Sequence, residues 1–207
     1  MTLGRLIARV AIGGLFAGHC TQKLLGWFGG SGVEGTAQTM HKLELRPARH
    51  NALASGTAET LGGTLLALGA LTPLAGSLIT GTMLTAIRKV HLPNGPWNTQ
   101  GGYEYNVALI AAALAMVDCG PGAPSVDRAL GIEKRGNLWT LATLAAGAAG
   151  STLAIEASRR FTANEVADQP NQGATGRFVR EGETVEETPP AQLSDRAARP
   201  QAARSSL

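Results

Sequence analysis

Cysteine, charge and aromatic residues are all scarce in this chain, and these shortages exclude several classes of function. Only two cysteines occur among 207 residues, Cys20 and Cys119, and they form no Cys-x-x-Cys pair, so we expect no dithiol active site. Charged residues make up 16% of the chain and the net charge is +3, with the basic residues scattered rather than gathered in a stripe. The sequence therefore gives no indication of nucleic-acid binding.

Large apolar residues are scarce in the C-terminal part of the chain. Residues 161–207 are rich in Glu, Arg, Gln, Pro and Ser, and they could not bury enough apolar surface to offset the entropy lost on ordering. We predict a disordered tail there. The residues before this tail have the opposite composition, since Leu, Ala, Gly and Ile are the most frequent types there. Their few aromatic residues gather at the ends of apolar segments, which is typical of the interfacial belts of membrane proteins.

Five apolar segments approach the length of about 20 residues that a helix needs to cross a bilayer. They cover residues 3–25, 51–71, 74–92, 103–119 and 138–157. His19 before Cys20 argues against a cleaved N-terminal signal, because cleavage requires a small residue at that place, so we expect the first segment to stay as a helix. Thr72-Pro73 predicts a tight turn that ends the second segment, and the third would then run antiparallel to it.

These segments predict an all-α protein, an integral membrane antiparallel four-helix bundle with a fifth hydrophobic helix and a disordered C-terminal tail. The predicted parts are the bundle (1–119), a polar linker (120–137), the fifth membrane helix (138–160) and the tail (161–207). The polar loop before the second segment could form a short interfacial helix over residues 36–45. Prolines and glycines exclude a regular helix over residues 92–102. Gly13, Gly14, Gly18, Gly62 and Gly63 would allow close approach of helices.

An up-and-down bundle would bring most of the polar residues of its helices to one end. Glu59 is the deepest carboxylate of this group, and it needs a partner such as Lys23, Arg88 or a histidine. A partly buried Glu beside His is a plausible pair for proton transfer. We predict a polar pocket that joins four residues as its catalytic groups: His19, Glu59, His91 and Glu104. Lys23, Tyr103, Tyr105 and Asn106 are the predicted contacts to a quinone head group.

Several alternatives stay open for these residues. Glu59 could form a structural ion pair, or it could be protonated and bonded to a carbonyl group. His19 and His91 could be ordinary helix-end histidines at the level of the lipid head groups. The spacing of the histidines and glutamates lacks the local patterns of metal ligands, so no metal site is predicted. No motif for haem, flavin or an iron–sulfur cluster occurs, so any electrons would come from a partner.

Three motifs in order resemble the DoxX family of small bacterial membrane proteins. They are Gly18-His19-Cys20-Thr21-Gln22-Lys23-Leu24-Leu25-Gly26, then Ala58-Glu59-Thr60-Leu61-Gly62-Gly63, and finally His91-Leu92-Pro93-Asn94-Gly95 followed by Gly101-Gly102-Tyr103-Glu104-Tyr105-Asn106. Their order and spacing agree with the family over roughly residues 1 to 119. The fifth hydrophobic segment and the tail depart from the minimal pattern of the family.

The resemblance implies a four-helix bundle in the bacterial plasma membrane. The family takes its name from a subunit of an archaeal thiosulfate:quinone oxidoreductase, and a mycobacterial relative is described as the membrane partner of a superoxide dismutase and a sulfurtransferase. We therefore expect a multi-pass membrane subunit of a redox system, with the lipid bilayer and soluble redox proteins as partners and a quinone as a possible cofactor. A non-catalytic membrane scaffold and a carrier of small molecules or lipids are the alternatives, and the sequence leaves open whether the chain is an enzyme.

Overall fold

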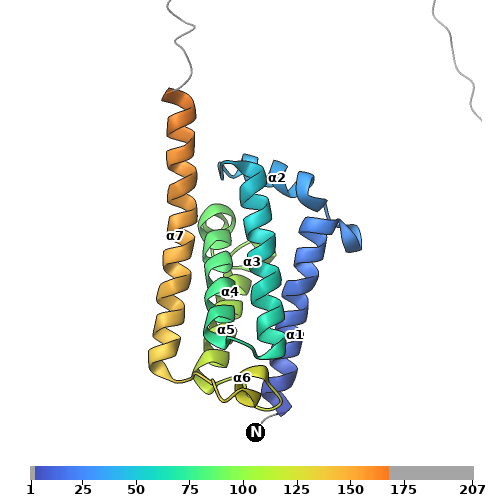
Figure 1. Ribbon diagram of the computed structural model, residues 1–207. Helices are drawn as coiled ribbons and strands as arrows, with labels where there is room; N and C mark the ends of the chain where they lie inside the picture. The colour runs from blue at the N-terminus through green and yellow to red at the C-terminus, as the bar shows by residue number, and fades with distance from the viewer. Residues whose placement is uncertain (1–2, 168–207) are drawn as a thin grey trace, which may run out of the picture. The chain divides into compact units, whose positions relative to one another are not determined.

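Seven α-helices make up most of the computed structural model, which describes residues 3–167 (Figure 1). The five long helices are α1 (Leu3–Cys20), α3 (Ala48–Leu68), α4 (Thr72–Ala86), α5 (Glu104–Cys119) and α7 (Asn137–Ala167); the short ones are α2 (Gly32–Lys42) and α6 (Val126–Ala129). No strand occurs within residues 3–167, as the all-α prediction requires. The five predicted apolar segments correspond to the five long helices.

The long helices run up and down beside one another (Figure 1). Helix α1 packs on α3, α3 on α4, and α4 on both α5 and α7. The core of this bundle consists of apolar residues from four helices: Phe16, Leu66, Ala75, Ile79 and Ala113. One end of the bundle carries the end of α1, the start of α3, the end of α4 and the start of α5 (Figure 1). We call it the polar end, and its counterpart the opposite end.

Glycines bring α1 and α3 into backbone contact. A Cβ atom on Gly13 would lie 2.4 Å from the carbonyl oxygen of Gly63, and a Cβ on Gly63 would lie 2.6 Å from that of Gly13. Only glycine is compatible with such a close approach. The predicted packing role is therefore confirmed at these two positions. Gly14 and Gly18 differ, because nothing in the described part of the chain lies within 4 Å of a Cβ added there.

Helix α7 packs on α4 through small residues, which accounts for its richness in Ala, Gly and Thr. A Cβ on Gly81 would lie 3.2 Å from the carbonyl oxygen of Gly147, and one on Gly76 would lie 2.9 Å from a methyl group of Thr143. The helix continues to Ala167, past the predicted boundary at residue 160. Residues 168–207, which form most of the predicted tail, lie outside the described residues.

Only one helix in the described part of the chain is both long and apolar enough to cross a membrane by length and composition, and it is α7 between Asn137 and Glu165. Helices α4 and α5 have 15 and 16 residues, although a π-helical turn continues α4 from Ile87 to His91. The fifth predicted segment, which is richer in Ala, Gly and Thr than in Leu, is therefore the one that meets the criteria of length and apolar composition.

Two connections differ from their prediction. Pro73 lies in the first turn of α4 and does not end α3; the turn consists of Gly69 to Leu71, and both of these residues have positive φ angles, 62° and 44°. Proline is well suited to a first helical turn, where its missing N–H has no partner to lose. The predicted polar linker contains helix α6 and folds onto the opposite end of the bundle (Figure 1).

The predicted interfacial helix corresponds to α2, which lies across the polar end (Figure 1).

Candidate functional site

Helices α1 and α4 both end in a π-helical turn at the polar end of the bundle. The first turn covers Thr21–Leu25 and carries Lys23, and the second covers Ile87–His91 and carries Arg88 and His91. A π-helical turn is rare and is often found at functional sites, because the extra residue turns side chains away from their helical positions. Gly26 ends the first turn with a φ of 71°, a conformation that favours glycine.

An ion pair joins the first π-helical turn to helix α3. The Nζ atom of Lys23 donates a hydrogen bond to Oε1 of Glu59 over 2.6 Å, and the hydroxyl of Ser55 lies 3.4 Å from the same oxygen. The side chain of Glu59 is 5% exposed and that of Lys23 is 34% exposed. Lys23 therefore neutralises a buried carboxylate while part of its own side chain stays accessible. The prediction that Glu59 has a basic partner is confirmed.

The second carboxylate oxygen of Glu59 takes no part in these hydrogen bonds. Its Oε2 atom is buried and has no hydrogen-bond partner among the described residues. A buried acceptor without a donor costs about 1–3 kcal/mol, more where the group is charged. The structure therefore presents a buried carboxylate oxygen, next to an ammonium group, that is free to accept a hydrogen bond or a proton.

Helix α2 and the end of α1 contact the segments that carry this pair. The hydroxyl of Thr36, on α2, donates a hydrogen bond to the backbone carbonyl of Lys23 over 3.1 Å. Cys20 is buried beside the pair and accepts a hydrogen bond from the hydroxyl of Thr60. Thr60 directly follows Glu59, so the first two sequence motifs meet here side chain to side chain.

The other three predicted catalytic residues bond to their own neighbours in the chain. His19 pairs with the amide oxygen of Gln22 at 3.1 Å, and Nδ1 of His91 donates to the carbonyl oxygen of Gly101 over 2.7 Å. Glu104 accepts a hydrogen bond from the backbone N–H of Asn98 over 2.8 Å. No hydrogen bond or ion pair links Glu59 to His19, His91 or Glu104 within residues 3–167. Of the predicted pocket residues, the structure joins only Glu59 and Lys23 directly.

The third sequence motif shapes the loop between α4 and α5. His91 and Asn94 both donate to the carbonyl oxygen of Gly101, and Glu104 holds the backbone at Asn98. A Cβ on Gly102 would lie 2.2 Å from the carbonyl oxygen of Gly95, so the missing side chain of Gly102 allows the two parts of the loop to approach closely. In this geometry the motif holds a tight loop at the polar end.

The predicted quinone contacts on α5 have separate surroundings. Asn106 is buried and its amide donates to the sulfur of Met83 at 3.4 Å, while the side chain of Tyr105 is half exposed. The backbone N–H of Tyr103 donates to the carbonyl of Gly95. Arg88, the other candidate partner of Glu59, instead donates to the hydroxyl of Thr152 on α7 over 3.1 Å.

Two buried charged residues at the opposite end escaped the sequence analysis. Arg9 is 2% exposed and donates to the carbonyl oxygens of Pro121, over 3.0 Å, and Pro124. Asp127 is also 2% exposed and accepts three hydrogen bonds, from the backbone N–H groups of Leu71 and Thr72 and from the hydroxyl of Thr72. An arginine inside an apolar segment is a signal that it requires a partner. Its partners are backbone carbonyls far along the chain, which no side-chain pattern reveals.

Within residues 3–167, no group of three or more His, Cys, Asp and Glu side chains could hold a metal ion.

Comparison with known proteins gives one match. The family model described as DoxX matches residues 4–92, which include α1 to α4, the Lys23–Glu59 pair and the start of the loop before α5. No curated protein and no solved structure matches the chain.

Proposed function

Residues 4–92 belong to the DoxX family, and from this premise we propose that the chain is a multi-pass membrane protein that binds a quinone head group at the Lys23–Glu59 pair. In this proposal the protein is the membrane subunit of a redox system, and a soluble redox protein supplies or removes the electrons. The observation that carries it is the 2.6 Å ion pair whose second carboxylate oxygen is buried without a donor.

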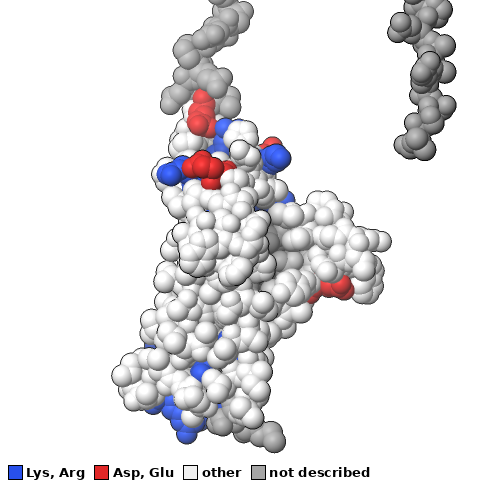
Figure 2. Space-filling view, turned by 90° about the vertical axis from the view of Figure 1, so that its right-hand side faces the viewer, with Lys and Arg blue, Asp and Glu red and all other residues white. Residues whose placement is uncertain are grey.

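The distribution of residues on the surface supports several membrane spans. On the face in Figure 2, Lys, Arg, Asp and Glu lie towards the two ends of the molecule and on the projection at its side, and the surface of the long helices between the two ends is largely free of them. Large apolar side chains on the outside of the long helices are half exposed or more, as in lipid-facing helices: Val10, Leu15, Leu61, Leu68, Leu141 and Leu153. In water such surfaces would be costly, whereas lipid chains would cover them.

The chemistry of the Lys23–Glu59 pair suits a quinone. Reduction of a quinone to a hydroquinone adds two electrons and two protons, so a site must bond to the ring oxygens and exchange protons with them. The ammonium group of Lys23 donates to a carbonyl oxygen, and Oε2 of Glu59 accepts a hydrogen bond from a hydroquinone hydroxyl. When a hydroquinone is oxidised, its two electrons pass to the soluble redox protein, Glu59 takes up one of the two protons, and the other passes to water on the partly exposed side of Lys23. Reduction of a quinone reverses each of these transfers.

Quinone titrations of the protein in lipid nanodiscs test this proposal. We expect a water-soluble, short-chain ubiquinone to bind saturably to the wild type, as measured by calorimetry, and binding to be lost in Glu59→Gln and in Lys23→Met. The matched control is Glu34→Gln, which removes a carboxylate from the exposed Glu34–Arg49 pair at the same end of the molecule. Binding by the control should equal that of the wild type.

Two results would contradict the proposal. Equal binding by Glu59→Gln and the wild type would move the site away from the ion pair. No saturable binding by a monodisperse wild-type sample would remove the quinone from the function altogether.

A further inference from the structure

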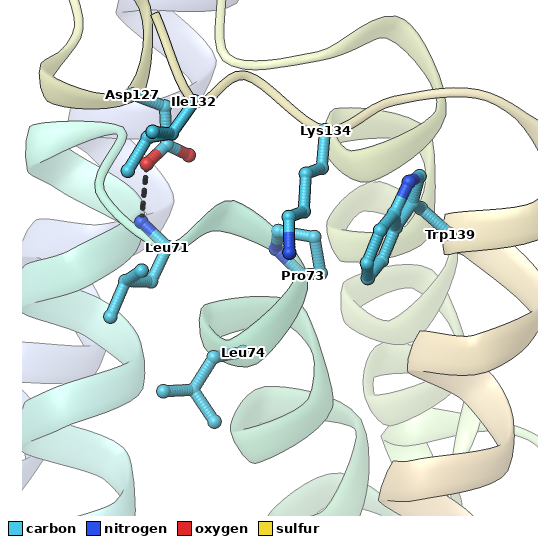
Figure 3. A pocket seen from close by; sticks show the side chains of 7 residues that line it. All are labelled: Leu71, Pro73, Leu74, Asp127, Ile132, Lys134 and Trp139. Atoms are coloured by element: carbon cyan, nitrogen blue, oxygen red, sulfur yellow. Dashed lines mark hydrogen bonds between the residues drawn. The ribbon is translucent and has the colours of Figure 1, made fainter. Parts of the chain in front are cut away.

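A half-open hollow of about 350 Å³ lies at the opposite end of the bundle, away from the Lys23–Glu59 pair. Its apolar walls come from the start of α4, from the connection after α6 and from the first turn of α7 (Figure 3). These wall residues are Leu71, Pro73, Leu74, Ile132 and Trp139. Leu71, Leu74 and Ile132 are each about half exposed, at 50%, 49% and 45%, so the walls continue directly into the outer surface.

The side chain of Lys134 extends into this hollow. Lys134 reaches down between Pro73 and Trp139, and its ammonium nitrogen lies 4.2 Å from the centre of the Trp139 ring (Figure 3). A lysine on a protein surface ordinarily extends its ammonium group into water. Here the group lies on the face of an aromatic ring, where a cation–π interaction holds it.

No carboxylate neutralises Lys134 within residues 3–167. The acidic residue that lines the hollow is Asp127, and both of its oxygens are engaged at the start of α4. Its Oδ1 accepts from the N–H of Leu71 over 2.7 Å, and its Oδ2 accepts from the N–H and the hydroxyl of Thr72 over 2.9 and 2.7 Å. The hollow therefore combines apolar walls with a lysine that forms no ion pair in the described part of the chain, and its one carboxylate, Asp127, is held by donors at the start of α4.

We propose that this hollow binds one anionic phospholipid, with its phosphate at Lys134 and the upper part of an acyl chain against Leu71, Leu74 and Ile132. The inference rests on the membrane location proposed above but not on the quinone site. The first turn of α7 supports the location, since Leu138 and Leu141 are 76% and 65% exposed and Trp139 lies between them. An exposed apolar surface with a tryptophan at a helix end is typical of the lipid interface. Basic side chains next to membrane helices attract the head groups of anionic lipids, and each contributes about 1 kcal/mol.

Fluorescence quenching by brominated lipids tests the proposal at the site itself. Trp139 is the one tryptophan of the chain at this end, because Trp27 and Trp97 lie at the polar end. In a Trp27→Phe/Trp97→Phe variant, reconstituted in phosphatidylcholine, we expect chain-brominated phosphatidylglycerol at low mole fraction to quench Trp139 saturably. Brominated phosphatidylcholine at the same mole fraction should quench it less.

Charge variants of the same protein identify the recognition element. Lys134→Met keeps an apolar stem and removes the charge, and it should weaken the apparent affinity for phosphatidylglycerol roughly five-fold, the loss expected for one basic residue. The matched control is Arg128→Met, which removes an exposed cation from α6 without altering the lining of the hollow. Arg128→Met should leave the affinity unchanged.

Three results would contradict the proposal. Equal quenching by the two lipids would show that the hollow does not select an anionic head group. Equal losses in Lys134→Met and Arg128→Met would show general attraction to the surface in place of a site. Absence of quenching by both brominated lipids would contradict the membrane location itself, and this result is distinct from a failure of quinone binding.

Discussion

Glu59 and Lys23 depend on each other unequally. A carboxylate that is 95% buried cannot recover its hydration when its partner is lost, whereas Lys23 is 34% exposed and can turn its ammonium group towards water. Breaking a buried ion pair is costly mainly because it leaves a buried charge uncompensated. Solvent around Lys23 screens part of the attraction, so the pair contributes less than a fully buried one would. The loss of the lysine should therefore cost more than the loss of the glutamate charge.

We predict that Lys23→Met lowers the free energy of unfolding by about 1–3 kcal/mol and that Glu59→Gln lowers it less. In the Glu59→Gln background, Lys23→Met should cost almost nothing, because no buried charge remains to be compensated. Denaturant unfolding of the detergent-solubilised variants gives these values. Arg49→Met, which opens the exposed pair with Glu34, should stay within about 0.5 kcal/mol of the wild type. A larger cost for Glu59→Gln than for Lys23→Met would contradict the account.

Asp127 has a comparable role at the opposite end. Its carboxylate accepts three hydrogen bonds from Leu71 and Thr72, and it thereby ties the connection after α5 to the first turn of α4. Asp127→Ala should destabilise the protein by about 1–3 kcal/mol, because the two buried donors of Thr72 and the partly buried N–H of Leu71 would lose their acceptor. Asp118→Ala, an exposed carboxylate at the same end, should have a smaller effect in the same unfolding assay. Similar losses for the two variants would show that burial of the donors is unimportant.

Small residues determine how the helices pair. Gly13 and Gly63 join α1 to α3, and Gly81 and Gly147 join α4 to α7, in each case with one backbone close to the other. Lipid chains are as apolar as leucine, so helices in a membrane gain little from burying apolar side chains against each other. Close contact between backbones supplies the packing instead, and the composition of α7 follows from this requirement.

Two glycines of α1 and α3 allow a direct test of that packing. We predict that Gly63→Ala destabilises the bundle by about 1–3 kcal/mol, because the new methyl group would lie 2.6 Å from the carbonyl oxygen of Gly13 and 2.7 Å from Cβ of Phe16. Gly14→Ala should be neutral or stabilising by up to about 1 kcal/mol, since the site is open and alanine favours the helix. Thermal unfolding in detergent measures both effects. A neutral Gly63→Ala would show that α1 and α3 separate without cost.

The order of the helices could be predicted from the sequence because glycines, prolines and polar runs interrupt the apolar segments. Their ends were less predictable. Neither of the two π-helical turns was predicted, because the residues of Thr21–Leu25 and Ile87–His91 are equally compatible with a continuing α-helix. Pro73 opens α4, and the sequence alone does not distinguish this position from the end of α3, because a proline is compatible with both.

The candidate site was predictable only in part, and the reason lies in the distances involved. An antiparallel arrangement places Lys23 and Glu59 in the same half of the bundle, so their pairing follows from topology. His91 and Glu104 were expected beside them for the same reason. Their actual partners, Gly101 and Asn98, are backbone groups of a loop whose turns the sequence does not specify. Arg9 was missed because its acceptors are carbonyl oxygens, which every residue has.

The distribution of basic residues between the two ends of the bundle predicts how it is oriented in the membrane. Among residues 3–167, eight basic residues lie at the polar end when α7 is included, and five belong to the other half. The first group is Lys23, Lys42, Arg46, Arg49, Arg88, Lys89, Arg159 and Arg160, and the second is Arg5, Arg9, Arg128, Lys134 and Arg135. Basic residues favour the cytoplasmic side of membrane proteins. An odd number of spans would also return the end of α7 to the side on which α2 lies.

Cysteine labelling of intact cells tests both the number of spans and the orientation. We predict that, in a variant without Cys20 and Cys119, a membrane-impermeant maleimide labels Leu130→Cys from outside but not Gln38→Cys on α2 or Asn164→Cys near the end of α7. All three positions are exposed, so permeabilised cells should label each of them and serve as the control. Labelling of Gln38→Cys and Asn164→Cys without Leu130→Cys would reverse the orientation and keep the five spans. Labelling of Asn164→Cys together with Leu130→Cys would show that α7 does not cross the membrane, and the exposed leucines of that helix would then require a protein surface to cover them.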